Sequence, residues 1–128
     1  MRLLLDTNRY IDLCRGDAGV AQHIREAQNV FLPFVVLAEL RAGFLCGTRP
    51  RRNEAMLGRF LNNPRVDVLY ADEQTTHHYA RLYRQLREQG TPIPHQDLWI
   101  AALAVQHDLY LLTRDQYFER LPQIPRLD

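Results

Sequence analysis

Short, wholly apolar segments constrain the fold of this chain most strongly. Leu3–Leu5, Val30–Leu32 and Leu109–Leu112 are too short to be core helices, and each contains only hydrophobic residues. Strands that are apolar on both faces are typical of a parallel sheet covered by helices on both sides. Val66–Tyr70, which alternates in polarity, and a segment near Ile124–Leu127 complete a predicted sheet of four to five short strands.

Helical segments separate these strands. Asp17 and Asp72 precede such segments as capping residues, and Gly47 and Gly90 follow them as stop signals. The pattern predicts helices at Thr7–Leu13, from Asp17 to about Gln28, at Phe34–Cys46, at Asn53–Leu61, from Asp72 to about Gln89, at Gln96–His107 and at Asp115–Leu121, with a basic turn at Thr48–Arg52. Strands that alternate with helices indicate an α/β protein. We expect one domain over residues 1–128, a three-layer α/β/α sandwich with a central, mainly parallel sheet.

Composition excludes several classes of protein. A hydrophobic content of 46% and a charged content of 24% are typical of a globular chain. No apolar run reaches the about 18 residues of a membrane span, and Asp6 comes too early for the apolar stretch of a signal peptide. We therefore expect a cytoplasmic protein without membrane contact. Cys14 and Cys46 lack the spacing of a metal site, and we expect them to be buried free thiols.

All 16 basic residues are arginine, and the net charge is +1. A charge this close to neutrality gives no argument for nucleic acid. Arginine binds phosphate in a two-pronged way, although the excess of arginine is equally explained by genomic base composition. The absence of lysine argues against phosphoacceptor signalling domains and haloacid-dehalogenase-like phosphatases, which need such a basic group beside their acids. The latter also need Asp-x-Asp after the first strand, where this chain has Asp6-Thr7-Asn8.

Four acidic residues stand where acids are unexpected. Asp6 ends the first apolar segment, and Asp115 follows the strand that ends at Leu112. The C-terminal ends of parallel strands meet at one edge of the sheet, which is where open α/β folds bind ligands. Glu39 and Asp97 belong to helices that are apolar nearly all round. We therefore expect both helices to be largely buried.

A buried carboxylate needs compensation by an arginine or a metal ion, because its removal from water is costly. Glu39 can pair with Arg41. Asp115 can pair with Arg114, and the other two acids can each cap a helix. If instead all four acids converge, their mutual repulsion favours a bound divalent cation. Oxygen ligands without histidine or cysteine suit Mg²⁺ or Mn²⁺ rather than zinc, so the four acids predict a site for one of these ions.

Four sequence blocks occur in order over essentially the whole chain: Leu4–Leu13, Val36–Gly43, Ile93–Ala102 and Leu112–Phe118. Each block carries one of the four acids beside apolar residues. Each is weak by itself, but the ordered set is highly specific and resembles PIN-domain proteins, in particular the VapC-type toxins of bacterial toxin–antitoxin pairs.

The resemblance implies a PIN-like fold and a Mg²⁺- or Mn²⁺-dependent endoribonuclease that forms a homodimer and is inhibited by a cognate antitoxin. It assigns metal binding and catalysis to the acids that match those of the family: Asp6, Glu39 and Asp97, with Asp115 completing the site. It also implies that the Thr113 hydroxyl lines the pocket and that Thr7 and Asn8 support the first acid.

Two departures from the family pattern concern residues close to the acids. Arg9 stands where the family usually has an aliphatic residue, and it can contact RNA phosphate, pair with Asp12 or lie at a dimer surface. We favour an exposed or paired structural role. His95 and Gln96 stand where the family often has a small residue and an asparagine, and we expect His95 to be an exposed loop residue. Neither departure removes a predicted metal ligand.

RNA hydrolysis is the reaction expected at these acids, with tRNA, rRNA or mRNA as substrate. Arg49, Arg51 and Arg52 can hold the RNA backbone or form an ordinary solvated surface, and Arg114 can contact a phosphate beside the acids. The helices predicted from Asp17 to Leu61 carry enough apolar surface to offer a groove to an antitoxin's amphipathic segment. The alternative function is a non-catalytic PIN-like RNA-binding or scaffold module.

Overall fold

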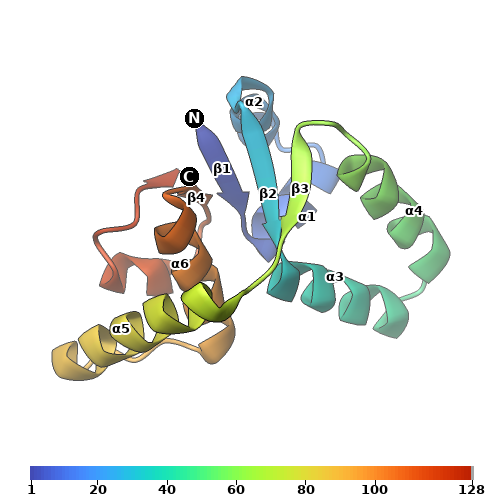
Figure 1. Ribbon diagram of the computed structural model, residues 1–128. Helices are drawn as coiled ribbons and strands as arrows, with labels where there is room; N and C mark the ends of the chain where they lie inside the picture. The colour runs from blue at the N-terminus through green and yellow to red at the C-terminus, as the bar shows by residue number, and fades with distance from the viewer. Residues whose placement is uncertain (128) are drawn as a thin grey trace.

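A five-stranded parallel sheet forms the centre of the protein (Figure 1), in a computed structural model that describes residues 1–127. The strands lie in the order β3-β2-β1-β4-β5. Their bounds are β1 Arg2–Leu5, β2 Asn29–Pro33, β3 Val66–Leu69, β4 Tyr110–Leu112 and β5 Arg126–Leu127. All four strand pairs are parallel. The prediction of an α/β fold with a mainly parallel sheet is thus confirmed.

The central strands are apolar because both of their faces are covered. Leu3, Leu4 and Leu5 of β1 have no exposed surface, and neither do Leu111 and Leu112 of β4. The covering helices are α1 Thr7–Cys14, α2 Ala18–Glu26, α3 Phe34–Cys46, α4 Pro50–Leu61, α5 Glu73–Gln89 and α6 His95–His107, with a short 3₁₀ helix, η1 Gln116–Arg120, before β5. Burial of this many leucine side chains is the main source of stability of the sheet.

The chain changes direction across the sheet at β1. It moves from β1 through β2 to the edge strand β3, and then crosses back through α5 and α6 to β4 on the other side of β1. Right-handed crossovers therefore place α1–α4 on one face and α5–α6 on the other, as Figure 1 shows. In such folds, ligands bind beyond the C-terminal ends of the strands where the direction reverses, here β1 and β4.

Several helix ends follow the local signals of the sequence. Asp17 caps α2 by accepting a hydrogen bond of 3.0 Å from the Val20 backbone N–H. Asp72 and Thr75 form a reciprocal capping box at the start of α5. Gly90 ends α5 in the left-handed conformation, with φ of 70°.

The structure also corrects four local predictions. α4 begins at Pro50 rather than Asn53, because proline is well suited to the first position of a helix. The residues after Asp115 form a 3₁₀ helix, and the last strand is only Arg126–Leu127. Cys14 and Cys46 are exposed free thiols rather than buried ones, because both lie at helix ends beyond the packed faces.

α3 differs most from its prediction as a largely buried helix. Only Val36, Leu37 and Leu40 are buried, and Leu45 is 80% exposed. The helix extends with α4 beyond the edge of the sheet (Figure 1), so only the stripe of these three residues is buried against the rest of the protein. Within residues 1–127, no helix combines the length and apolarity that a bilayer span requires.

Candidate active site

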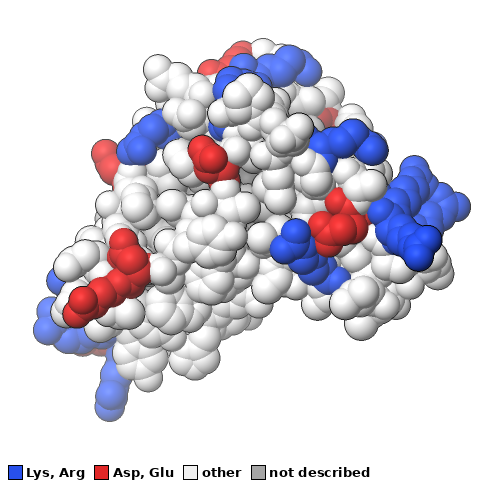
Figure 2. Space-filling view, turned by 45° about the vertical axis from the view of Figure 1, so that its right-hand side comes forward, with Lys and Arg blue, Asp and Glu red and all other residues white. Residues whose placement is uncertain are grey.

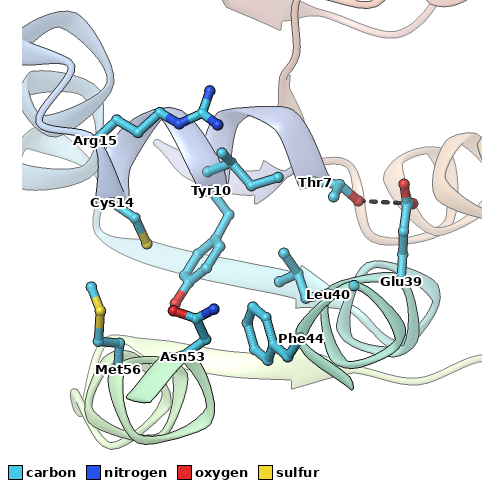
Figure 3. A pocket seen from close by; sticks show the side chains of 11 residues that line it. Thr7, Tyr10, Cys14, Arg15, Glu39, Leu40, Phe44, Asn53 and Met56 are labelled. Carbon is cyan, nitrogen blue, oxygen red and sulfur yellow. Dashed lines mark hydrogen bonds between the residues drawn. The ribbon is translucent and has the colours of Figure 1, made fainter. Parts of the chain in front are cut away.

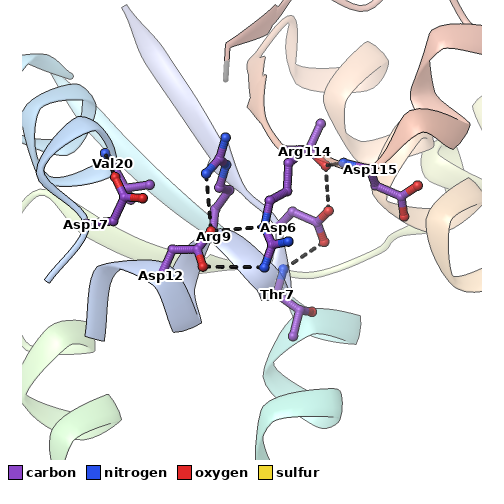
Figure 4. A network of polar contacts seen from close by, with 9 residues as sticks. Asp6, Thr7, Arg9, Asp12, Asp17, Val20, Arg114 and Asp115 are labelled. Carbon is purple, nitrogen blue, oxygen red and sulfur yellow. Dashed lines mark hydrogen bonds and ion pairs between the residues drawn. The ribbon is translucent and has the colours of Figure 1, made fainter. Parts of the chain in front are cut away.

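Asp6 lies at the C-terminal end of β1, beside the end of β4. Its backbone N–H donates to the Leu112 carbonyl at 3.2 Å. One carboxylate oxygen accepts from the Thr7 N–H and the other from the Thr113 hydroxyl, both at 2.7 Å. The Thr113 hydroxyl oxygen in turn accepts from the Asp115 N–H at 3.0 Å (Figure 4). Thr113 therefore links the two acids that follow β1 and β4.

Glu39 reaches the same region from α3. Its Oε2 accepts a hydrogen bond of 3.0 Å from the Thr7 hydroxyl, as Figure 3 shows, and a second one from the Gln96 side-chain amide. Glu39 is exposed, so its predicted burial is wrong: it lies outside the buried stripe of α3, which consists of Val36, Leu37 and Leu40. Two hydrogen bonds, rather than enclosure, hold this carboxylate.

Asp97 is half-buried in the first turn of α6. Burial, followed by repulsion from Asp115, Asp6 and Glu39, raises its pKa to about 7. The pKa of Asp6 is also raised, mainly by burial, despite the hydrogen bonds from Thr113 and Thr7 that favour its charged form. Asp115 and Glu39 add to this increase. The four acids therefore share one electrostatic environment.

The donor set of this cluster fits a hard divalent cation. It consists of four carboxylates, and the charges of Asp115, Asp6 and Glu39 add to burial in raising the pKa of Asp97, which a nearby cation would counteract. Within residues 1–127, however, no three His, Cys, Asp or Glu side chains are already gathered closely enough to hold one ion. Repulsion keeps unscreened carboxylates apart, so small side-chain rotations would have to accompany metal binding.

Two of the acids also have ordinary structural roles. Asp6 caps α1 through the Thr7 N–H, and Asp115 caps η1 by accepting from the Tyr117 N–H at 2.9 Å. Capping leaves the remaining lone pairs of each carboxylate available, so the structural and the functional interpretation are compatible.

The proposed arginine partners of the acids are found elsewhere. Arg41 binds Glu54 through two hydrogen bonds, of 3.0 and 3.2 Å, rather than Glu39. Arg114 binds Asp12 rather than Asp115. Asp12 also pairs with Arg9 at 3.2 Å, which confirms the paired role expected of Arg9. No described arginine therefore neutralises the acid cluster by an ion pair.

Sequence reasoning missed two residues at the site. Gln96 connects α6 to Glu39, and the only sequence signal for it is its position directly before Asp97. Asp12 binds two arginines beside Asp6, although only its pairing with Arg9 was anticipated. Asn8 is exposed, and no hydrogen bond to Asp6 is seen among the described residues.

The remaining candidates are exposed residues outside the hydrogen-bond network that holds Asp6 and Glu39. His95 is exposed, as expected, but it is the first residue of α6 rather than a loop residue, and its Nδ1 lies 2.7 Å from the Tyr79 hydroxyl. Basic side chains gather at the right-hand edge of the view in Figure 2, over α4. The exposed residues at the beginning of this helix include Arg51 and Arg52, with Arg49 immediately before it.

A groove of about 510 Å³ adjoins the acid cluster between α1, α3 and α4 (Figure 3). Thr7 and Glu39 lie at one end, and Tyr10, Phe44 and Met56 supply much of its apolar lining. A groove was predicted from the helices between Asp17 and Leu61. The structure shows that α1, rather than α2, provides the wall opposite α3 and α4.

Comparisons with known proteins agree with this architecture. The PIN domain matches residues 3–124. Ribonuclease VapC1 of Haemophilus influenzae is 30% identical over 97% of this chain and 95% of its own length. In the structure of VapBC-1 from nontypeable H. influenzae, a chain superposes with a TM-score of 0.88 at 28% identity, covering 100% of this chain and 98% of that one. In VapBC-5 of Mycobacterium tuberculosis, described as a member of the VapBC family of toxin–antitoxin systems, the TM-score is 0.77 at 28% identity, with 98% of both chains covered. The chain belongs to the PIN domain family.

Proposed function

We propose that this protein is a metal-dependent endoribonuclease and the toxin of a toxin–antitoxin pair. The observation that carries the proposal is the acid cluster at the C-terminal ends of β1 and β4, in which burial and three neighbouring acids raise the pKa of Asp97 to about 7. Groups with such perturbed pKa values are typical of functional sites. The ribonuclease name of the VapC1 relative supports RNA as the substrate.

Asp6, Glu39, Asp97 and Asp115 are the residues that would hold Mg²⁺ or Mn²⁺. When bound, such a cation supplies positive charge for activating water and for stabilising the oxygen that leaves phosphorus. The protein contributes the orientation of the acids. Thr113 and the Thr7 N–H fix both oxygens of Asp6, while the Thr7 hydroxyl and Gln96 fix Glu39.

The reaction is hydrolysis of an RNA phosphodiester. Water adds to phosphorus, the bond from phosphorus to the 3′ oxygen breaks, and that oxygen receives a proton. Asp97 holds a proton near neutral pH in the absence of a cation, because burial and the other acids disfavour its charged form. The exposed arginines at 49, 51 and 52 are positioned to bind the RNA backbone at a distance from the acids.

The groove between α1, α3 and α4 is the proposed seat of the antitoxin. Its apolar lining suits the apolar face of an amphipathic helix. An antitoxin arginine at the Thr7–Glu39 end would reach the acid cluster, which has no described arginine partner of its own. Gel filtration with and without the product of the neighbouring gene tests this assignment, and a failure to co-elute would contradict it.

A homodimer is also proposed. In Figure 2, a broad face without charged side chains extends between α5 and α3. Phe34 of α3 and Tyr79 of α5 each pack against Trp99 of α6, and all three side chains are only partly buried in the single chain. Apolar surface of this kind is typical of subunit interfaces. A monomeric mass at micromolar concentration in light scattering would contradict the homodimer.

Cleavage of RNA tests the central proposal. Purified protein is incubated with total RNA in Mg²⁺, in Mn²⁺ and in EDTA, and new 5′ ends are mapped. We expect cleavage only with metal, and its loss in Asp6→Asn with the fold intact. Asp67→Asn, an acid-to-amide change on the exposed side of β3, is the matched control. Full metal-dependent activity of Asp6→Asn would refute the site, and no cleavage by the wild type would favour a non-catalytic RNA-binding module.

A further inference from the structure

A three-residue ion network, Arg9–Asp12–Arg114, lies directly beside the acid cluster (Figure 4). Arg9 and Asp12 belong to α1, one turn apart, and Arg114 is the residue between Thr113 and Asp115. The Arg114 Nε donates to Asp12 Oδ2 at 3.1 Å, and its Nη2 donates to Oδ1 at 3.4 Å. The network thus connects the helix after Asp6 to the loop that carries Asp115.

The burial of the three side chains is uneven. The exposed fractions are 12% for Arg9, 14% for Asp12 and 52% for Arg114. A nearly buried guanidinium needs a negative partner, and Asp12 is the only described acid that pairs with Arg9. The Arg9 Nε is buried without a hydrogen-bond partner, which makes this cation depend on Asp12 still more. Asp12 is therefore held in place from the protein side by Arg9.

The charge balance of the network leaves one positive charge. Asp12 alone would neutralise Arg114, but Asp12 also compensates Arg9, so two cations share one anion. Because Arg9 is enclosed, the surplus positive charge reaches solvent through Arg114, whose Nη1 is not used by Asp12. A guanidinium fixed by one two-pronged contact and open on its other side is a suitable phosphate ligand.

Arg114 also borders open space. It lines a hollow formed by the loop after β4 and by η1, together with Asp115, Gln116, Tyr117, Glu119 and Arg120. The Arg120 guanidinium lies over the Tyr117 ring, 5.1 Å from its centre, and Tyr117 is 38% exposed. A phosphate in this hollow would meet Arg114 directly beside Asp115, one of the four acids.

We infer that Arg114 binds an RNA phosphate adjacent to the one that is cleaved, and that Asp12 and Arg9 are positioning residues that hold Arg114 for this contact. The inference rests on the proposed ribonuclease function, because it assigns the RNA side of the same site. The network also gives Arg9 a definite role, because this nearly buried arginine fixes Asp12.

RNA binding without cleavage tests the phosphate contact. Each variant is made in the Asp6→Asn background, and the affinity for a fluorescein-labelled single-stranded RNA of about 12 nucleotides is measured by anisotropy across a range of salt concentrations. Arg114→Gln should weaken binding about tenfold and reduce the slope of log affinity against log salt by about 0.7, the value for one phosphate contact. Arg84→Gln, at an exposed site on α5, is the matched control. Equal affinity and slope in Arg114→Gln and Arg84→Gln would overturn the inference.

Two further variants test positioning separately from charge. Arg9→Met with Asp12→Asn removes one positive and one negative charge, so the net charge is unchanged while Arg114 loses its anchor. We expect RNA affinity to fall about threefold to tenfold, and an added Arg114→Gln to cause a smaller further loss than it does alone. Arg114→Lys keeps the charge at an exposed site but cannot form the two-pronged contact, so it should bind more weakly than arginine. If Arg9→Met with Asp12→Asn and Arg114→Lys both bound RNA with the affinity of the parent protein, Asp12 and Arg9 would have no positioning role.

Different results would contradict the ribonuclease function and the role of Arg114. Absence of metal-dependent cleavage by the unsubstituted protein contradicts the ribonuclease function. Normal cleavage by the unsubstituted protein together with normal cleavage and RNA binding by Arg114→Gln contradicts only the role of Arg114. Urea unfolding of each variant identifies any loss of affinity that is caused by loss of fold.

Discussion

Replacement of Asp97 by asparagine should stabilise the metal-free protein at alkaline pH. Burial and three neighbouring acids raise the pKa of Asp97 from its ordinary value of 3.8 to about 7. None of the side-chain hydrogen bonds described within residues 1–127 involves this carboxylate, so the substitution removes the charge without breaking one. Asparagine is close to aspartate in shape, and the expected change is therefore electrostatic.

The direction in which stability changes with pH follows from the number of protons bound by the folded and the unfolded chain. Between about pH 4 and pH 7 the unfolded chain has lost the Asp97 proton while the folded protein still holds it, so folding becomes less favourable as the pH rises. A shift of about 3 units corresponds to about 4 kcal/mol at 1.4 kcal/mol per unit. Asp97 is only half-buried, and solvent screening reduces the expected gain of Asp97→Asn to about 2 kcal/mol.

Urea unfolding in EDTA at pH 4.5 and pH 8 measures this effect. Near the acidic end the variant and the wild type should differ little, and at pH 8 Asp97→Asn should be the more stable. Added Mn²⁺ should reverse the order, because a cation that binds only the folded wild type stabilises it increasingly as the free Mn²⁺ concentration exceeds the dissociation constant. Asp67→Asn, on the exposed side of β3, should show neither effect.

A wild type as stable as Asp97→Asn at pH 8 in EDTA would refute the reasoning, since burial and the neighbouring acids would then not disfavour the charged form of Asp97. If Mn²⁺ raised the unfolding free energy of the wild type and of Asp97→Asn by the same amount, Asp97 would not be a ligand. The measurement does not need an RNA substrate, so its outcome is independent of the identity of the target.

Three other substitutions probe the elements that support the site. Gln96→Ala removes a hydrogen bond that orients Glu39, and it should lower the cleavage rate about tenfold. The unfolding free energy should change little, so cleavage kinetics and urea unfolding of the same variant check the prediction together. Phe118→Ala leaves a cavity at a fully buried position below the Asp115 loop, and it should lower the unfolding free energy by about 3–5 kcal/mol; a loss below about 1 kcal/mol would contradict the tight packing. Gly90→Ala has space for its Cβ but a φ of 70°, so it should lower the unfolding free energy by about 1 kcal/mol, and no loss would contradict the strained backbone.

Much of the fold follows from local sequence signals. The all-apolar segment Leu3–Leu5 predicts a strand covered on both faces, and its complete burial confirms this. Asp17, Asp72 and Gly90 mark helix ends because caps depend on residues that are close in sequence. Asp6 and Asp115 were predicted to share a sheet edge because they directly follow strands, and the alignment of Leu5 with Leu112 places them there.

Other features of the site depend on contacts between distant parts of the chain. The composition of α3 predicts burial, but only the stripe at Val36, Leu37 and Leu40 meets the sheet, because the helix runs past the edge strand. Glu39 is consequently held by hydrogen bonds from Thr7 and Gln96, 32 and 57 residues away. Hydrophobic periodicity describes which face of a helix is apolar, but it does not show whether another element covers that face.

The sequence by itself therefore determined the α/β architecture and the sheet edge, and it predicted which four acids form the site. The tertiary structure decided how the groups of the site are held: Thr113 holds Asp6 across 107 residues, and Asp12 holds the neighbouring Arg114 across 102. The reason is physical. Strands and caps arise from neighbouring residues, whereas the charge, exposure and orientation of an acid depend on which distant side chains the topology brings beside it.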